Sequence, residues 1–210
     1  MDALSYVLTS GWASGISVYA TILVTGLAGR IGGLDNVPDV FQRTDVLIIA
    51  AALTAFEFVV DKIPYVDSAW DFVHTAIRPA FAAVIGGLIA GQIGDLNEAV
   101  GAVLGGTTAF ATHGTKASLR LAANTSPEPV SNVALSLSED TTLVGVLLLA
   151  IHHPWIAAII ALTLLVAGVA IATFLMIKIR QGLSRLRSRY GAARTLSSAR
   201  AGNAQQASKE

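Results

Sequence analysis

The stretch WIAAIIALTLLVAGVAIATFLMI, residues 155–177, contains no charged side chain. A helix needs ~20 mainly apolar residues to cross the hydrocarbon core of a bilayer, so this stretch predicts a transmembrane helix. The whole chain of 210 residues agrees with that setting: 53% of its residues are hydrophobic, 13% are charged, and the mean hydropathy is +0.63. A soluble domain with so few charges would expose large apolar patches to water. We therefore expect a membrane protein.

Five further apolar segments approach the length of a span, at residues 4–29, 45–60, 72–94, 99–123 and 133–151. The fold class that we predict is all-α, a polytopic membrane helix bundle of about six transmembrane helices. The alternative is four spans with two half-buried helices, because the second and fifth segments are short or polar at one end. Residues 1–178 would form the bundle, and residues 179–210 a basic tail that is helical at its start and then disordered.

The charges of the chain balance overall, but residues 178–210 contain eight Lys or Arg and a single acidic residue. Basic segments next to a span stay in the cytoplasm, so we expect the tail there, where it would bind anionic lipid headgroups. Six crossings would place the N-terminus in the cytoplasm as well. We expect the lipid bilayer, rather than a nucleic acid, to be the partner of the tail.

Two short patterns recur along the chain. Residues 28–35 (AGRIGGLD) and 90–97 (AGQIGDLN) are identical at five of eight positions. The pattern Pro-x-x-[Asp/Asn] occurs at 64–67 and again at 129–132, and it is typical of a turn that leads into a helix. The bundle is therefore either built from repeated helix hairpins or contains chance similarities between glycine-rich turns.

Inside the predicted apolar segments, glycines four residues apart occur three times, and small residues at this spacing let helix backbones approach closely in lipid. They favour tight packing inside one bundle, with a homo-oligomer interface as the alternative. The three pairs are Gly11 with Gly15, Gly87 with Gly91, and Gly101 with Gly105.

The charged residues of the apolar region are concentrated in two groups with helical spacing, so each group shares helix faces. The first group comprises Glu57, Asp61, Asp67, Asp71, His74 and Arg78. The second comprises His113, Lys116, Arg120 and Asn124. Ionisable side chains in membrane segments are costly and normally face a partner or a wet cavity. We therefore predict a polar chamber in the cytoplasmic half of the bundle, open to the cytoplasm.

The function that we predict from this chamber is a membrane transporter or flippase for an anionic substrate, either a small organic anion or a phosphorylated lipid. Proton coupling is part of this hypothesis. The substrate would be bound by Arg78, Lys116, Arg120, His113 and Asn124. Coupling would use Glu57, Asp61, Asp67, Asp71 and His74. The alternative for the same residues is a structural network of ion pairs.

Two other functional classes stay open. A scaffold or adaptor would act through the basic tail, and a lipid-modifying enzyme would act inside the membrane. The chain has no cysteine, and it lacks the HExxH, GxSxG, P-loop and Rossmann patterns. We therefore predict no catalytic residue, no metal site and no cofactor, and we leave open whether the protein is an enzyme.

Three stretches resemble a family of small bacterial membrane proteins, the domain of unknown function 4126. They are EFVVDKIPYVDSAWDFVHTAIRP (57–79), NTSPEPVSNVALSLSED (124–140) and SGISVYATILVTGLAGRIG (14–32). The resemblance covers about residues 5–155. It implies a multi-span protein of the bacterial cytoplasmic (inner) membrane and brings no settled substrate or mechanism.

Overall fold

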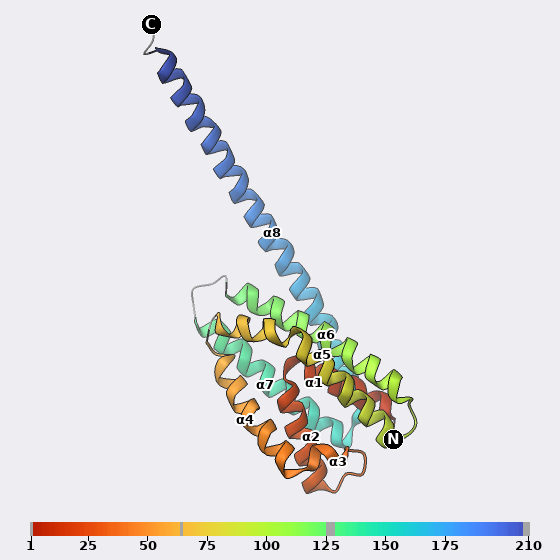
Figure 1. Cartoon of the computed structure of the whole chain (residues 1–210). Coiled ribbons are helices and arrows are strands. Elements are labelled where there is room, and N and C mark those ends of the chain that lie inside the picture. Colours follow the sequence, from red (N-terminus) through yellow and green to blue (C-terminus); the bar gives the residue numbers. More distant parts are fainter. Residues whose placement is uncertain (1, 64, 125–128, 208–210) are drawn as a thin grey trace. The chain divides into compact units, whose positions relative to one another are not determined.

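The computed structural model describes residues 2–63, 65–124 and 129–207 (Figure 1). These residues form helices and no strand, which confirms the all-α fold class. The helices are α1 (Ala3–Ile16), α2 (Val18–Gly32), α3 (Asp39–Gln42), α4 (Thr44–Val60), α5 (Val66–Ile93), α6 (Glu98–Ala123), α7 (Pro129–His152) and α8 (Pro154–Ala207).

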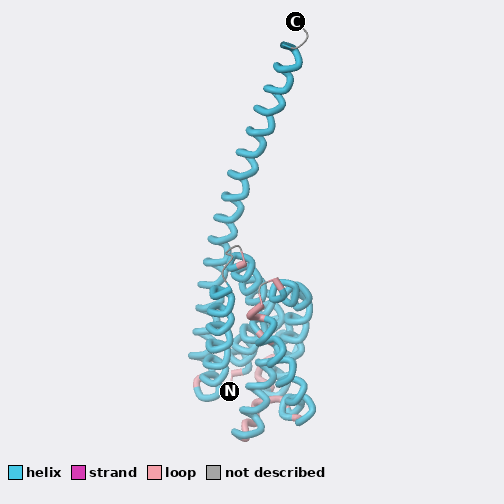
Figure 2. The backbone as a smooth tube through the Cα atoms, turned by 90° about the vertical axis from the view of Figure 1, so that its left-hand side faces the viewer, coloured by secondary structure: helices cyan, strands magenta, loops and turns pink. Residues whose placement is uncertain are grey.

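The chain divides into two compact units, Met1–Ala172 and Thr173–Glu210. The first unit contains α1 to α7 and the beginning of α8, and the second unit continues α8 as far as Ala207 (Figure 2). Helix thus extends into the segment from residue 197 onward, where we expected disorder. The reason is local: no proline follows Pro154, and Ala, the best helix former, occupies four of the eleven positions 197–207.

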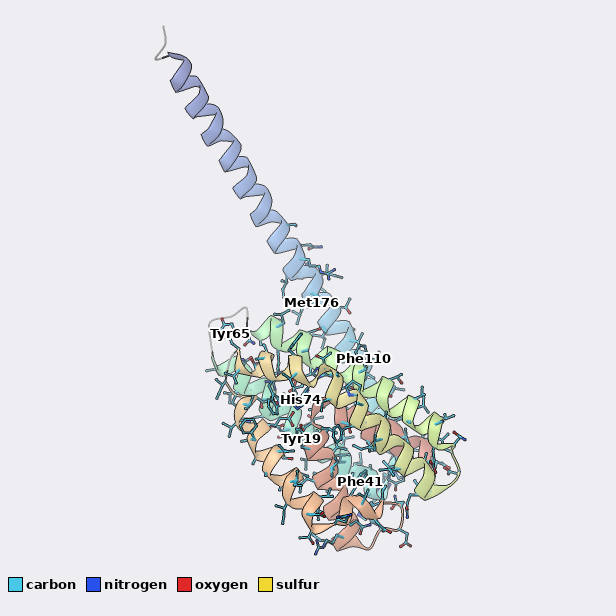
Figure 3. The ribbon with its side chains drawn as sticks, viewed as in Figure 1. Tyr19, Phe41, Tyr65, His74, Phe110 and Met176 are labelled. Carbon is cyan, nitrogen blue, oxygen red and sulfur yellow. The ribbon has the colours of Figure 1, made fainter. Side chains whose placement is uncertain are left out.

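The first unit has charged side chains inside and apolar side chains outside. Arg78 is 0% exposed, whereas Phe72, six residues earlier on the same helix, is 82% exposed. Figure 3 shows side chains projecting from the outer faces of the helices, among them Phe110. Water would not tolerate this distribution, but lipid favours it. Three helical segments are long and apolar enough to cross a membrane: Val66–Ile93, Asn132–His152 and Pro154–Gly182. The chain is a membrane protein.

The expected single span over residues 4–29 is wrong, because the helix breaks at Ser17. This residue has extended backbone angles, φ −150° and ψ 112°, and separates α1 from α2. Its hydroxyl oxygen accepts a hydrogen bond from the N–H of Ala20 and so caps α2. Serine competes for backbone partners in this way and interrupts a helix more readily than an apolar residue does.

α1 and α2 form a helical hairpin with Ser17 at its apex. With 14 and 15 residues, each helix is only about 22 Å long, which is less than the ~30 Å hydrocarbon core. Both open ends of the hairpin lie at one end of the unit (Figure 1). There the N–H of Ala3 donates to Asp95, and Gln92 donates to the carbonyl of Asp35. The hairpin therefore enters the bundle and returns to the side from which it came.

Glycines allow the hairpin and the neighbouring helices to pack at backbone distance. A Cβ atom added at Gly11 would lie 2.9 Å from the carbonyl oxygen of Gly105, and one added at Gly105 would lie 2.5 Å from that of Ala82. α1 thus packs on α6, and α6 packs on α5, with no room for a side chain. Gly11 and Gly105 therefore serve helix packing within one chain.

The hairpin predicts that the N-terminus and the segment after α2 lie on the same side of the membrane. The chain has no cysteine, so single-cysteine variants Asp2→Cys, Asp35→Cys and Ile63→Cys can be labelled without background. In sealed proteoliposomes, we expect a membrane-impermeant maleimide to label the first two variants from one side and the third from the other. Labelling of Asp2→Cys and Asp35→Cys from opposite sides would mean that residues 4–29 cross the membrane once.

A buried cluster of charged side chains

The structure brings all ten predicted site residues together in the first unit. They come from the end of α4, the first half of α5 and the second half of α6, and α7 adds residues from its first half. We call the whole set the charge cluster. Its members are Glu57, Asp61, Asp67, Asp71, His74, Arg78, His113, Lys116, Arg120, Asn124, Asn132 and Glu139.

Arg78 lies at the inner end of the charge cluster and has no exposed surface. Its Nη2 atom donates to Glu57 Oε1 at 2.6 Å, and its Nη1 atom lies 3.1 Å from Asp71 Oδ1. Nη1 also donates to His113 Nδ1 at 2.8 Å and to the carbonyl of Gly15 at 3.3 Å. One guanidinium therefore joins α5 to the hairpin, to α4 and to α6.

Lys116 and Arg120, one turn apart on α6, share two carboxylates. Lys116 Nζ lies 2.7 Å from Asp61 Oδ2 and 3.8 Å from Glu139 Oε2. Arg120 Nη2 lies 3.0 Å from each of the same two oxygens. Asp61 follows the last residue of α4; burial acts to raise the pKa of its carboxyl, but Lys116 and Arg120 outweigh burial and hold that pKa below its usual value.

The hairpin apex supplies acceptors that the sequence analysis did not include. The last carbonyls of a helix have no partner within it, and here Gly15 and Ile16 accept hydrogen bonds from Arg78 and Lys116. The hydroxyl of Ser17 donates to Glu57 Oε2. The broken helix thus contributes backbone oxygen to the charge cluster. The signal in the sequence is a glycine and two serines inside an apolar segment.

The outer end of the charge cluster contains amide side chains. Asn132 Nδ2 donates to Asp67 Oδ2 at 3.2 Å and to Asn124 Oδ1 at 2.6 Å, and Asn124 Nδ2 donates to Asp67 Oδ1 at 3.2 Å. Asp67 and Asn132 are the last residues of the two recurring Pro-x-x-[Asp/Asn] patterns. The two patterns therefore place their polar ends against each other.

The hydrogen bonds indicate that His113 is neutral, and they give both ring nitrogens of His74 a partner. His113 Nδ1 accepts from Arg78, which can only donate, so the ring proton is on Nε2, and Nε2 lies 3.0 Å from the carbonyl of Asp71. His74 Nδ1 lies 2.8 Å from the carbonyl of Trp70, and its Nε2 faces the hydroxyl of Tyr19 at 3.0 Å (Figure 3). The imidazole of His113 therefore has both a donor and an acceptor partner.

The charge cluster contains more acidic than basic groups. Five carboxylates, Glu57, Asp61, Asp67, Asp71 and Glu139, face three permanent cations, Arg78, Lys116 and Arg120. Neither oxygen of Asp71 has a hydrogen-bond donor, nor does Oδ1 of Asp61. Each of the five carboxylates has a cation within 4 Å, but a net excess of two negative charges is costly at such burial, so two protons or small cations would stabilise the charge cluster.

Among the described residues, ion pairs fill the centre of the charge cluster, where we expected a polar chamber open to the cytoplasm. The three cations are each at most 3% exposed. A cavity of about 190 Å³ lies beside the charge cluster instead. Its wall consists of Trp12, Ile16, Thr112, Thr115, Lys116, Leu119, Ser138, Glu139, Thr142, Leu164, Leu165 and Gly168. Among the described residues, no three His, Asp or Glu side chains converge as ligands of a metal ion would.

Loss of one cation from the charge cluster should destabilise the fold. Arg120→Gln leaves Asp61 and Glu139 with Lys116 alone, and breaking a buried ion pair costs about 3–5 kcal/mol. We expect a clear fall in the thermal unfolding midpoint in detergent. Arg43→Gln is the matched control, because Arg43 pairs with Asp45 at an exposed position. Equal midpoints for the two variants would contradict a structural contribution of the charge cluster.

The chain matches no curated protein and no solved structure. The sequence profile of one family, described as "Domain of unknown function (DUF4126)", matches residues 4–173. This range includes the hairpin, the whole charge cluster and the wall of the adjacent cavity. The match covers most of the chain, and the chain therefore belongs to the DUF4126 family of membrane proteins.

Proposed function

We propose that the protein is a proton-coupled transporter or flippase for an anionic amphiphile, such as a phosphorylated lipid. The observation that carries this proposal is the 190 Å³ cavity, because one buried cation of the charge cluster, Lys116, forms part of its wall.

The composition of the cavity favours an amphiphile over a small organic anion. Trp12, Leu119 and Leu164 give it an apolar wall, which suits an acyl chain. The ionic part of the wall is Lys116 with Glu139, and the hydroxyls of Thr112, Thr115, Ser138 and Thr142 add hydrogen-bonding groups. A phosphate headgroup needs cationic and hydroxyl partners of this kind. A small polar anion would leave most of the apolar wall unused.

The carboxylates of the charge cluster provide a coupling mechanism. In the structure, Asp61 and Glu139 form ion pairs with Lys116 and Arg120, so these cations are not available to a phosphate. Protonation of either carboxyl would remove its charge and release a cation. An anion and a proton would then bind together, and departure of the proton would restore the ion pairs and expel the anion.

The hairpin changes the orientation that we propose. With the basic tail in the cytoplasm of a bacterium, the turn between α4 and α5 faces the cytoplasm, and the turn between α7 and α8 faces outward. The N-terminus lies at the outward end, because Ala3 bonds Asp95 in the turn between α5 and α6. This replaces the cytoplasmic N-terminus expected from six crossings.

Lys116→Ala should abolish lipid translocation. The probe is phosphatidylglycerol labelled with a nitrobenzoxadiazole fluorophore, in proteoliposomes, with loss of fluorescence after external dithionite as the readout. We expect at least a tenfold slower translocation than in the unmodified protein, because the headgroup loses its cationic partner. Labelled phosphatidylcholine, which has no net charge, should be translocated more slowly than phosphatidylglycerol by the unmodified protein.

A double variant, Lys116→Met with Glu139→Gln, removes one basic and one acidic group, so the net charge of the charge cluster stays the same. It therefore controls for stability. We expect it to remain folded, by its unfolding midpoint, and to be inactive. If the double variant translocates the probe at the unmodified rate, Lys116 does not bind the headgroup.

Removal of residues 183–210 separates a transporter from an adaptor that acts through the tail. The charge cluster and the cavity both lie before residue 173, so we expect the shortened chain to retain translocation of labelled phosphatidylglycerol. Because the shortened chain has fewer basic residues, we expect it to bind vesicles of anionic lipid more weakly at low salt than the full chain does. Loss of translocation in a folded, shortened chain would favour the adaptor.

A further inference from the structure

The hairpin carries a second set of buried polar groups, outside the charge cluster. These are hydroxyl side chains in a helix pair that is otherwise apolar. Ser10, Ser14 and Ser17 on the side of α1, and Thr21 on α2, are each at most 4% exposed. The proposed function so far uses only the hydroxyl of Ser17.

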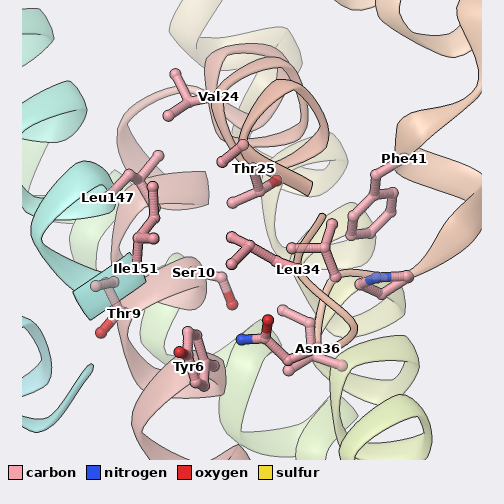
Figure 4. A pocket seen from close by; sticks show the side chains of 15 residues that line it. Tyr6, Thr9, Ser10, Val24, Thr25, Leu34, Asn36, Phe41, Leu147 and Ile151 are labelled. Atoms are coloured by element: carbon pink, nitrogen blue, oxygen red, sulfur yellow. The ribbon is translucent and has the colours of Figure 1, made fainter. Parts of the chain in front are cut away.

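The hydroxyls form two rows that meet at the apex. Ser10 and Ser14 are four residues apart on α1, and Thr21 and Thr25 are four apart on α2, so each pair shares one helix face, with Ser17 between the two helices. The hydroxyls of Ser10, Thr21 and Thr25 donate to backbone carbonyls and keep their lone pairs free to accept. Both rows begin at Ser17. Both also end at one cavity, because Ser10 and Thr25 line the same space (Figure 4).

This cavity lies near the open ends of the hairpin. Its volume is about 40 Å³, and a water molecule needs roughly 10–15 Å³ of such space together with polar partners, which Tyr6, Thr9, Ser10, Thr25 and Asn36 can supply in an otherwise apolar wall. Figure 4 shows Tyr6, Ser10 and Asn36 around it. Asn36 is partly exposed and belongs to the segment after α2. The cavity therefore lies close to the aqueous side at which the hairpin enters the bundle.

Ser14 lies between Ser10 and Ser17 in the chain and has an unexplained hydroxyl. Its side chain is fully buried, and its Oγ atom has no hydrogen-bond partner in the structure. A buried hydroxyl without a partner costs about 1–3 kcal/mol, and a water molecule between Ser10 and Ser14 would satisfy it. At the apex, Ser17 already donates to Glu57, which pairs with Arg78.

We infer that these hydroxyls and intervening water form a proton path from the Asn36 cavity to Glu57. Each hydroxyl accepts one proton and passes one on, so no bond other than O–H changes. A proton that arrives on Glu57 neutralises the carboxylate and leaves Arg78 with Asp71 alone. The inference rests on the proposed proton coupling and adds the route by which the proton enters. This route reaches the charge cluster from the side opposite the turn between α4 and α5.

The path predicts that water and small ions reach position 14 but not position 13. Ala13 is equally buried and packs in an apolar cluster with Trp12 and Leu143. In the full-length chain, Ag⁺ should block the thiol of a Ser14→Cys variant against maleimide added after denaturation. The Ala13→Cys variant should stay at least tenfold less blocked. Equal blocking of both variants, or of neither, would overturn the path.

Proton flux gives a second test with an isosteric pair of variants. Vesicles containing phosphatidylglycerol and a trapped pH-sensitive dye report the decay of an imposed pH gradient. We expect Ser14→Thr to conduct like the unmodified protein, and Ser14→Val, which has the same shape without a hydroxyl, to conduct at least fivefold more slowly. Equal rates for these two variants would overturn the inference.

The two proposals can fail separately. If Lys116→Ala translocates labelled phosphatidylglycerol normally while Ser14→Val still blocks proton flux, the proposed substrate site is wrong and the proton path stands. If Lys116→Ala is inactive while Ser14→Thr and Ser14→Val conduct alike, the path is wrong and the substrate site stands.

Discussion

The fold depends on one constraint, the pairing of three cations that are enclosed by an apolar bundle. A guanidinium or ammonium group without partners would not be stable at that burial. Arg78, Lys116 and Arg120 therefore draw carboxylates from α4, α5 and α7 towards α6 and α5. The hairpin apex completes the coordination of Arg78 and Lys116 with backbone carbonyls. The break of the helix at Ser17 and the charge cluster thus stabilise each other.

The same constraint makes the charge cluster responsive. Its carboxylates exceed its cations by two, and several of their oxygens lack donors. The arrangement is therefore well suited to gain protons, and each proton gained would weaken an ion pair between helices. A cluster that only tied the bundle together would be more stable with balanced charges. The cavity contacts the charge cluster at Lys116, and the hydroxyl rows contact it at Glu57 through Ser17.

Much of the site was predictable because helical spacing is a local property. The intervals of three and four residues from Asp67 to Arg78, and from His113 to Asn124, place each group on one helix face whatever the rest of the fold. The structure brings both groups together. Asn132 and Glu139 were less evident, since a lone amide or carboxylate near a helix start is also typical of a capping residue.

The sequence by itself determined that the chain is a helical membrane protein with charged faces turned inward, because hydropathy and helical period depend only on neighbouring residues. Tertiary structure alone decided that residues 4–29 fold back at Ser17, since a serine in an apolar helix is usually tolerated, and only Glu57, Arg78 and Lys116 make the break favourable. It also decided that the charges of the described residues in the charge cluster pair with one another. Whether opposite charges on different helices meet or face water depends on the distances between the helices. A local sequence pattern does not determine these distances.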